Sequence, residues 1–319
     1  MRLFDEIARD YQGPARYTEP EFCYLNRSAR IRVARIRQVL ETWFSSYPTA
    51  HQKALCQDFR SADDSQHRSA FFELFLHQLL LRLGCYLTIH PSPAETTKYP
   101  DFLIEPPGGA CFYLEAVLAT GESRKECAAR ARMNAVYDTL DQLESPDFFI
   151  GMELKGAPRT PPRGTEIRSF IACKLASLDP DQIIRQYESS GLVALPRWRF
   201  EHDGWRIDFF PIPKKPDARG RVGVRPLAWW SPEGWRANTV DVIRDAISRK
   251  ASRYGRLDLP YVIAVNVLSI TVDELDVIEA LDGAWTSRAD PDHTRVSAVL
   301  VANNLLPWNI PRAGIRLYP

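Results

Sequence analysis

The feature that most restricts the fold is one apolar helical pattern followed by three short apolar runs. Phenylalanine and leucine recur at three- and four-residue steps over residues 69–83, which predicts a helix that ends before Gly84. The runs at 85–89, 101–104 and 111–117 are short and bounded by proline and glycine, as is typical of strands. The predicted order is therefore helix, strand, strand, strand.

Two acidic residues lie at related positions of the second and third strands. Residues 106–109, Pro-Pro-Gly-Gly, predict a hairpin turn, so Asp101 and Glu115 are expected at the same end of an antiparallel pair. Carboxylates placed in this way are hard oxygen ligands that suit Mg²⁺ better than zinc. The alternative is that Asp101 caps a turn and Glu115 is an ordinary outward strand residue. A third acid, Glu73, lies on the preceding helix, and His77 beside it is interpreted as a packing or hydrogen-bonding residue.

The segments around these acids resemble a known family. Pro100-Asp101 followed by Leu114-Glu115-Ala116-Val117 resembles the paired motif of the PD-(D/E)XK nuclease superfamily. That resemblance implies an α/β fold with a restriction endonuclease-like core of helix, three-stranded meander, helix and strand. It also implies that Asp101 and Glu115 hold a divalent metal, Mg²⁺ or Mn²⁺, and that Glu73 corresponds to the helical acid which some branches add to the metal ligands.

The sequence departs from the family pattern at one position. The family places a lysine two residues after the second acid, and here that residue is Val117, which points to the same side of the strand as Glu115. Either the lysine has moved to another element or the site is inactive. Lys250 is the first candidate, because Lys250 and Tyr254 resemble the Gln-xxx-Tyr pair of RecB-type members, and Lys125 is the second. A solvent-facing surface lysine is the alternative for Lys250.

The resemblance also divides the chain. Residues 69–117 and 240–267 would form the core of a nuclease-like domain spanning 69–319, with a large α+β insertion at about 118–239. The second part of this core is predicted as a helix over 240–254 and a strand over 261–267, and a closing helix and strand follow. Residues 1–68 form a helical N-terminal segment, in which an arginine-rich helical pattern opens at Asn26 and runs to about Ser45. The arginines are interpreted either as a solvated helix face or as a helix lying along a phosphate backbone.

The insertion carries a cation-rich loop over residues 214–225. Five cations stand there against one acid, which predicts contacts to nucleic acid: Lys214, Lys215, Arg219, Arg221 and Arg225. Tryptophans flank this loop: Trp205, Trp229, Trp230 and Trp235. They are expected either to stack on exposed bases or to seal the core of the insertion, since tryptophan serves both purposes.

Composition excludes several classes of protein. The 41 lysines and arginines against 40 acids leave a net charge of +1, so any phosphate binding must depend on local patches. The six cysteines lack CxxC spacing, which argues against zinc and against a disulfide scaffold. No secretory leader or membrane-length apolar run is found, so we expect a cytoplasmic protein that does not bind membranes.

The expected function is that of a metal-dependent endonuclease that hydrolyses DNA phosphodiester bonds. Restriction or defence against foreign DNA is a role implied by the resemblance alone. The first alternative is a catalytically inactive nucleic-acid-binding or interaction module of the same fold, and the second is an unrelated α/β fold in which the motif arose by chance. DNA is the expected partner, with a homodimer or a protein partner contacting the insertion as further options.

Overall fold

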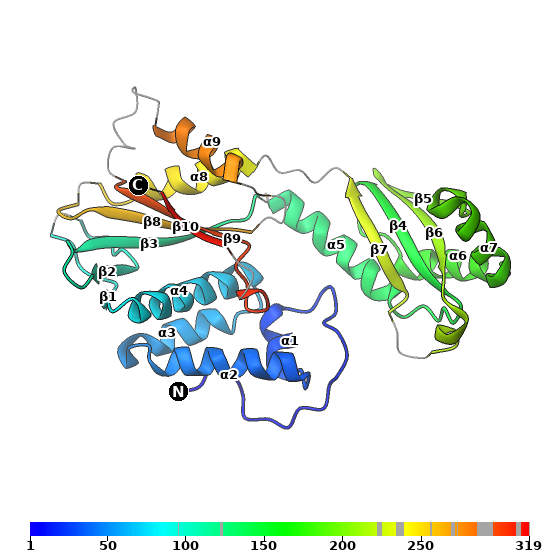
Figure 1. Cartoon of the computed structure of the whole chain (residues 1–319), viewed down its shortest axis with the longest axis horizontal. Coiled ribbons are helices and arrows are strands. Elements are labelled where there is room, and N and C mark those ends of the chain that lie inside the picture. Colours follow the sequence, from blue (N-terminus) through cyan, green and yellow to red (C-terminus); the bar gives the residue numbers. More distant parts are fainter. Residues whose placement is uncertain are drawn as a thin grey trace. The chain divides into compact units, whose positions relative to one another are not determined.

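The computed structural model describes most of the chain. The described residues are 1–94, 96–121, 124–221, 225–233, 239–255, 257–268, 272, 274–285, 296–310 and 314–318. Over these ranges the protein is an α/β structure with nine α-helices and two mixed sheets (Figure 1). It divides into two units: unit 1 comprises residues 1–15, 19–121 and 237–319, and unit 2 comprises 16–18 and 122–236.

Unit 1 contains a six-stranded sheet in the order β1-β2-β3-β8-β9-β10. The strands are β1 (Tyr86–Ile89), β2 (Phe102–Glu105), β3 (Phe112–Ala119), β8 (Tyr261–Val267), β9 (Ala298–Asn303) and β10 (Gly314–Tyr318). β1, β2 and β3 pair in antiparallel fashion, which confirms the three-strand order and the hairpin expected from the Pro-Pro-Gly-Gly turn. β8 lies parallel to β3 and to β9, and β10 returns antiparallel to β9.

Helices cover both faces of this sheet. α4 (Asp64–Arg82) packs on one face, where its phenylalanines join Phe102 and Leu114 in a core. α8 (Thr239–Ala251) and α9 (Glu274–Trp285) cover the other face (Figure 1). Because neighbouring strand residues point to opposite faces, Leu114 faces α4 while the next residue, Glu115, faces α8.

α4 begins five residues earlier than its apolar pattern predicts. The carboxylate of Asp63 accepts a hydrogen bond from the backbone N–H of Ser65 at 2.9 Å, so it caps the helix and adds a polar first turn. Apolar periodicity detects only the part of a helix that faces a core, which explains the difference. The predicted end is close to the observed one, and Gly84 follows in the left-handed region with φ +80°.

The N-terminal residues form three further helices where the sequence predicts one. They are α1 (Glu21–Arg27), α2 (Ile31–Ser45) and α3 (Thr49–Phe59). The predicted opening at Asn26 is wrong, because Ser28 and Arg30 are extended and separate α1 from α2. Arg37 is buried and donates to the carbonyl oxygens of Leu25 and Ser28 at 2.7 Å. These helices share the hydrophobic core of α4, so they are part of unit 1.

Unit 2 packs helices against a second sheet of order β5-β6-β4-β7. Its strands are β4 (Phe148–Gly156), β5 (Trp198–His202), β6 (Trp205–Pro213) and β7 (Leu227–Glu233). Its helices are α5 (Arg124–Leu140), α6 (Gly164–Ala176) and α7 (Pro180–Ser190), with the short 3₁₀ turns η1 (Gly191–Ala194) and η2 (Pro216–Ala218). The sequence does not predict β5, because Arg199 and Glu201 interrupt its apolar pattern. Its backbone pairs in antiparallel fashion with β6.

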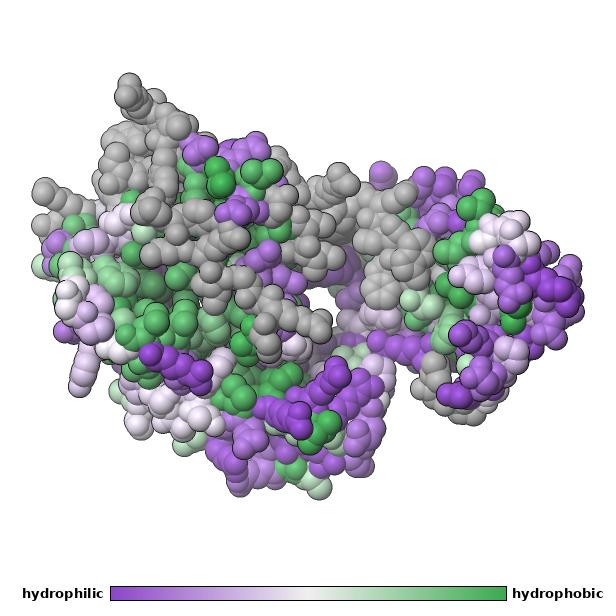
Figure 2. All heavy atoms as spheres, in the orientation of Figure 1, coloured by the Kyte–Doolittle hydropathy of each residue, from purple (hydrophilic) through white to green (hydrophobic). Residues whose placement is uncertain are grey.

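The surface and the helix lengths complete the description of the fold. Figure 2 shows that hydrophilic residues dominate the region of α7 on the face in view. None of the helices in the described ranges has the length and apolar character needed to cross a bilayer.

The C-terminal region contains one strand more than predicted, because β9 and β10 follow α9 where the sequence indicates a single strand.

Candidate active site

The pairing of β2 with β3 brings Asp101 and Glu115 to the same place. Phe102 lies opposite Leu114 at the end of this antiparallel ladder, so Asp101 and Glu115 are the two residues just beyond its last pair. Asp101 also reaches β3 itself, because its Oδ2 accepts a hydrogen bond from the backbone N–H of Ala116 at 2.7 Å.

Glu115 is a fully buried carboxylate held by three donors. The Nζ of Lys250 forms an ion pair with Oε1, and the hydroxyl of Tyr254 donates to Oε2. Arg253 adds a second cation on Oε1, with its Nη1 3.0 Å away. The side chain of Glu115 is 0% exposed, so each of these contacts is made in an environment of low polarity, where charge interactions are strong.

All three donors come from one short stretch at the end of α8. The helix ends at Ala251, so the sequence prediction that it runs to Tyr254 is wrong: Lys250 is in its last turn, and Tyr254 lies in the turn that follows. The N–H of Arg253 bonds to the carbonyl of Lys250 at 3.2 Å, which tightens this turn, and Gly255 follows with φ +70°. Tightening brings the donors of residues 250 and 254 to opposite oxygens of one carboxylate.

The loop that carries the Pro-Asp motif is fastened to the same turn. The hydroxyl of Tyr254 lies 3.1 Å from the carbonyl oxygen of Tyr99, two residues before Asp101. The Nζ of Lys98 donates to the carbonyl oxygen of Arg253 at 2.8 Å. Asp101 and the donor turn after α8 therefore hold a fixed arrangement although about 150 residues separate them in the sequence.

The electrostatic setting of Asp101 favours a bound cation. Burial, followed by the negative charges of Glu115 and Glu73, raises the pKa of Asp101 to about 7, against the opposing effects of the Ala116 N–H and Lys250. A carboxyl group whose pKa is raised by burial and by neighbouring carboxylates gains most from a nearby positive charge. Perturbed acids of this kind cluster at functional sites.

Glu73 approaches from the other face of the sheet, on α4. It accepts a hydrogen bond from the hydroxyl of Tyr47, and burial raises the pKa of its carboxyl group. His77, one turn along the same helix, is 2% exposed and packs with its ring 4.8 Å from that of Tyr47. The packing role predicted for His77 is confirmed, and burial lowers its pKa to about 4.

The residue at the position of the family lysine lies in apolar surroundings in the structure. Val117 is half-buried and packs against the core formed with α8, on the same face as Glu115. Lys250 reaches Glu115 from α8 instead, so the surface-lysine alternative for it is wrong. Lys125, the second candidate, is exposed near the start of α5 in unit 2.

The side chains of this site that could bind a metal ion are two acids. Within the described residues, no group of three or more His, Cys, Asp or Glu side chains is close enough to hold a metal ion, so Glu73 does not complete a three-ligand set here. The donors that fit a metal are the carboxylates of Asp101 and Glu115. Mg²⁺ is commonly held in proteins by one or two carboxylates together with several waters, so this pair suits a hydrated Mg²⁺ or Mn²⁺.

Three of the five cations predicted to bind nucleic acid are engaged within unit 2. Lys214 is buried and donates to the carbonyl oxygen of Ser145 at 2.7 Å. Arg219 pairs with Asp181, and Arg225 pairs with Asp141, each at 2.6 Å.

The other two cations of this loop are exposed. They are Lys215 and Arg221, and the Nη2 of Arg221 donates to the carbonyl oxygen of Asp217 at 2.9 Å. Trp205 is 1% exposed and belongs to the core of unit 2, as one of the two interpretations predicts. The side chains of Trp229, Trp230 and Trp235 lie outside the described residues.

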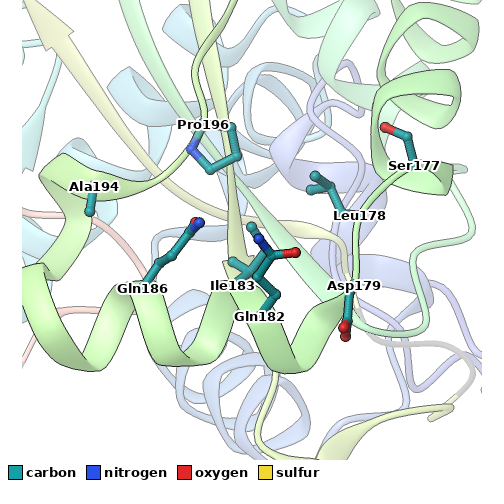
Figure 3. A pocket seen from close by; sticks show the side chains of 8 residues that line it. All are labelled: Ser177, Leu178, Asp179, Gln182, Ile183, Gln186, Ala194 and Pro196. Carbon is teal, nitrogen blue, oxygen red and sulfur yellow. The ribbon is translucent and has the colours of Figure 1, made fainter.

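A hollow on unit 2 is a separate feature. It measures about 270 Å³ and lies between α7 and the segment that ends at Pro196, with Gln182 and Gln186 among its lining side chains (Figure 3). Asp179 also lines it and caps α7 by accepting from the N–H of Asp181 at 2.9 Å. The described side chains around it include no cation, so it lacks the groups that a phosphate requires.

Arg253 is the site residue that the sequence interpretation missed. It lies between Lys250 and Tyr254, so the spacing that singled out those two also contained it. Residues three and four apart lie on one face of a helix, so Arg253 was placed beside Lys250 and Tyr254 by the same spacing, and the structure shows that it contacts Glu115 from the turn after α8. Comparisons of the chain with protein-family models, with curated proteins and with solved structures found no match.

Proposed function

We propose that this protein is a metal-dependent endonuclease that hydrolyses phosphodiester bonds in DNA, with Asp101, Glu115 and Lys250 at its active site. One observation carries the proposal: Asp101 and Glu115 lie just beyond the last pair of β2 and β3, Asp101 accepts from the backbone N–H of Ala116, and the ammonium group of Lys250 is bound to Glu115. Two acids that can hold a metal ion, with a cation beside them, are the smallest set of groups for metal-assisted attack of water on a phosphate.

The order of elements in unit 1 supports the same proposal. α4, the antiparallel strands β1 to β3, α8 and the parallel strand β8 follow the order of a restriction endonuclease-like core. Unit 2 is inserted between β3 and α8. We assign the PD-(D/E)XK core to these elements as part of the proposal, and the role in restriction or defence rests on the resemblance alone.

Each residue has a defined part in the proposed reaction. Asp101 and Glu115 would hold the divalent ion, and the negative charge of Glu73 would add to the attraction for it. When bound, this ion supplies Lewis-acid stabilisation of the phosphate charge and a more acidic attacking water. Lys250 would orient that water and balance the charge that develops on the phosphate. Tyr254 fixes the carboxylate of Glu115 and the backbone at Tyr99, so the two acids keep their relative position.

Plasmid cleavage tests the proposal directly. The purified protein is expected to nick or cut supercoiled plasmid with Mg²⁺ or Mn²⁺ and to be inactive with EDTA. Asp101→Asn and Glu115→Gln should each reduce the rate at least about 100-fold, because each removes a charged ligand of the ion. The proposal is wrong if the unmodified protein cleaves plasmid no faster than these two variants at every metal concentration tested.

A second candidate function has its own supporting observation. Both oxygens of Glu115 are occupied by side chains of the protein, and Val117 stands where the family has its lysine. This arrangement also suits a catalytically inactive nucleic-acid-binding module, in which Lys250 and Arg253 neutralise the acid permanently. Equal DNA binding by the unmodified protein and by both carboxylate variants, without cleavage in any of them, would support this second function.

A further inference from the structure

We propose that Arg253 is a substrate-anchoring residue that releases Glu115 when the divalent ion binds and then holds a phosphate group of the DNA. The inference rests on the proposed function, because it concerns the same site. It assigns a regulated role to a residue that has no place in the motif of the family, and it follows from the contacts of one carboxylate.

The contacts of Glu115 leave little room for a further ligand. Its Oε1 accepts from both Lys250 and Arg253, and its Oε2 accepts from Tyr254. A carboxylate offers about four lone-pair positions in total. A divalent ion that binds either oxygen of Glu115 therefore lies on a carboxylate that already pairs with two cations, and repulsion favours the departure of one of them.

Arg253 is the donor best able to leave. Its side chain is 44% exposed, against 20% for Lys250, and Tyr254 is 3% exposed. Lys250 lies in α8, where its carbonyl oxygen also accepts from the hydroxyl of Tyr261 at 3.2 Å. Arg253 lies in the turn beyond the helix, and its exposed side chain can rotate into water by breaking its single hydrogen bond to Glu115.

The chemistry around Arg253 indicates what it binds after release. A guanidinium group binds a phosphate through two parallel hydrogen bonds, and a single carboxylate oxygen uses only part of that capacity. The exposed Lys98 has its ammonium group on the carbonyl oxygen of Arg253 at 2.8 Å, which adds a second cation at the same edge. Two neighbouring cations beside a metal site match consecutive phosphates of a nucleic-acid strand.

The proposal is tested on the full-length protein by two binding measurements. Mn²⁺ affinity is measured by calorimetry, and the affinity for a fluorescent 20-base-pair DNA duplex is measured by anisotropy with Ca²⁺ in place of Mg²⁺. Arg253→Gln should bind Mn²⁺ about three- to tenfold more tightly, because a competing cation has been removed. The same variant should bind DNA about tenfold more weakly, because a charge-assisted contact is lost.

A matched control lies on the same helix. Arg249 is exposed, carries the same charge and donates to the carbonyl oxygen of Asp245 within α8. Arg249→Gln should change both affinities less than about twofold. Arg253→Lys should recover part of the DNA affinity, because it keeps the charge but loses the paired hydrogen bonds.

The outcomes separate this inference from the proposed function. If the unmodified protein binds Mn²⁺ and cuts DNA but Arg253→Gln leaves both affinities unchanged, the inference is wrong and the nuclease proposal stands. Weaker Mn²⁺ binding by Arg253→Gln would also overturn the inference, since it would show that Arg253 only supports the site. If the unmodified protein neither binds Mn²⁺ nor cuts DNA, both the inference and the nuclease proposal are wrong.

Discussion

The two units of this protein hold their charged side chains in different ways. In unit 1, three donors converge on the single buried carboxylate of Glu115. In the cation-rich loop of unit 2, Arg219 and Arg225 are each paired with one acid, Asp181 and Asp141. This loop is the richer in cations along the sequence, yet the fully buried carboxylate that pairs with two cations lies in unit 1.

This difference shows that charge density along a chain is a poor guide to a binding surface. A single exposed ion pair contributes up to about 1 kcal/mol and leaves both groups satisfied. A buried carboxylate shared among several donors is costly to desolvate, and removing one partner leaves the others unbalanced. A site of the second kind responds strongly to a new ion, and the following predictions test whether unit 1 responds in that way and unit 2 does not.

The largest expected effect concerns Lys250. Lys250→Ala should lower the plasmid cleavage rate about 100- to 1000-fold, because it removes the cation beside the proposed ligand Glu115. Lys125→Ala provides the matched control, since Lys125 is an exposed lysine of unit 2, and it should cleave at an unchanged rate. Unchanged cleavage by Lys250→Ala would falsify the idea that the family lysine has moved to α8.

The second prediction compares the stabilities of two neutralised acids. Glu115→Gln should lower the free energy of unfolding by about 2 to 3 kcal/mol, because Lys250 keeps its charge at a largely buried position without a counter-ion. Asp181→Asn should cost less than about 1 kcal/mol, because that carboxylate is 61% exposed. Urea unfolding measures both, and equal losses would erase the distinction between the two units.

The third prediction concerns the buried His77. The pKa of the buried His77 is lowered to about 4, so between pH 6.5 and 4 the unfolded chain binds more protons than the folded one. Stability therefore falls as pH falls through this range. His77→Leu should remove about 2 kcal/mol of the loss between pH 7 and pH 5.

Urea unfolding of His77→Leu and of the unmodified protein is compared at pH 7 and at pH 5. A steeper loss in His77→Leu than in the unmodified protein would contradict the assignment of a buried neutral imidazole.

The smallest expected effect concerns the exposed cations of unit 2. Lys215→Ala with Arg221→Ala should weaken DNA binding only a few-fold and lower the slope of log Kd against log salt by about 1 to 2, because phosphate contacts release counterions. Arg219→Ala, which breaks an internal pair, should leave the slope nearly unchanged. A loss of DNA affinity larger than that of Arg253→Gln would move the main DNA-binding surface to unit 2.

Local patterns predicted much of unit 1. Apolar periodicity located α4, and the Pro-Pro-Gly-Gly turn specified the antiparallel pairing that brings Asp101 and Glu115 to the same end. The strand at 261–267 was predicted with its observed bounds, because its apolar residues are continuous and buried on both faces. These features depend on residues that are close in sequence, so the order of residues is sufficient to define them.

What the sequence determined by itself is thus the helix, the hairpin and the two acids that the hairpin aligns. The tertiary structure alone decided which cations are available: Lys214 became a buried donor to a backbone carbonyl, whereas Arg253 contacts the buried carboxylate of Glu115. A cation has many partners within reach in a compact chain, and the choice depends on burial and on contacts between residues that are 69 and 138 positions apart in these two cases, which no local pattern records.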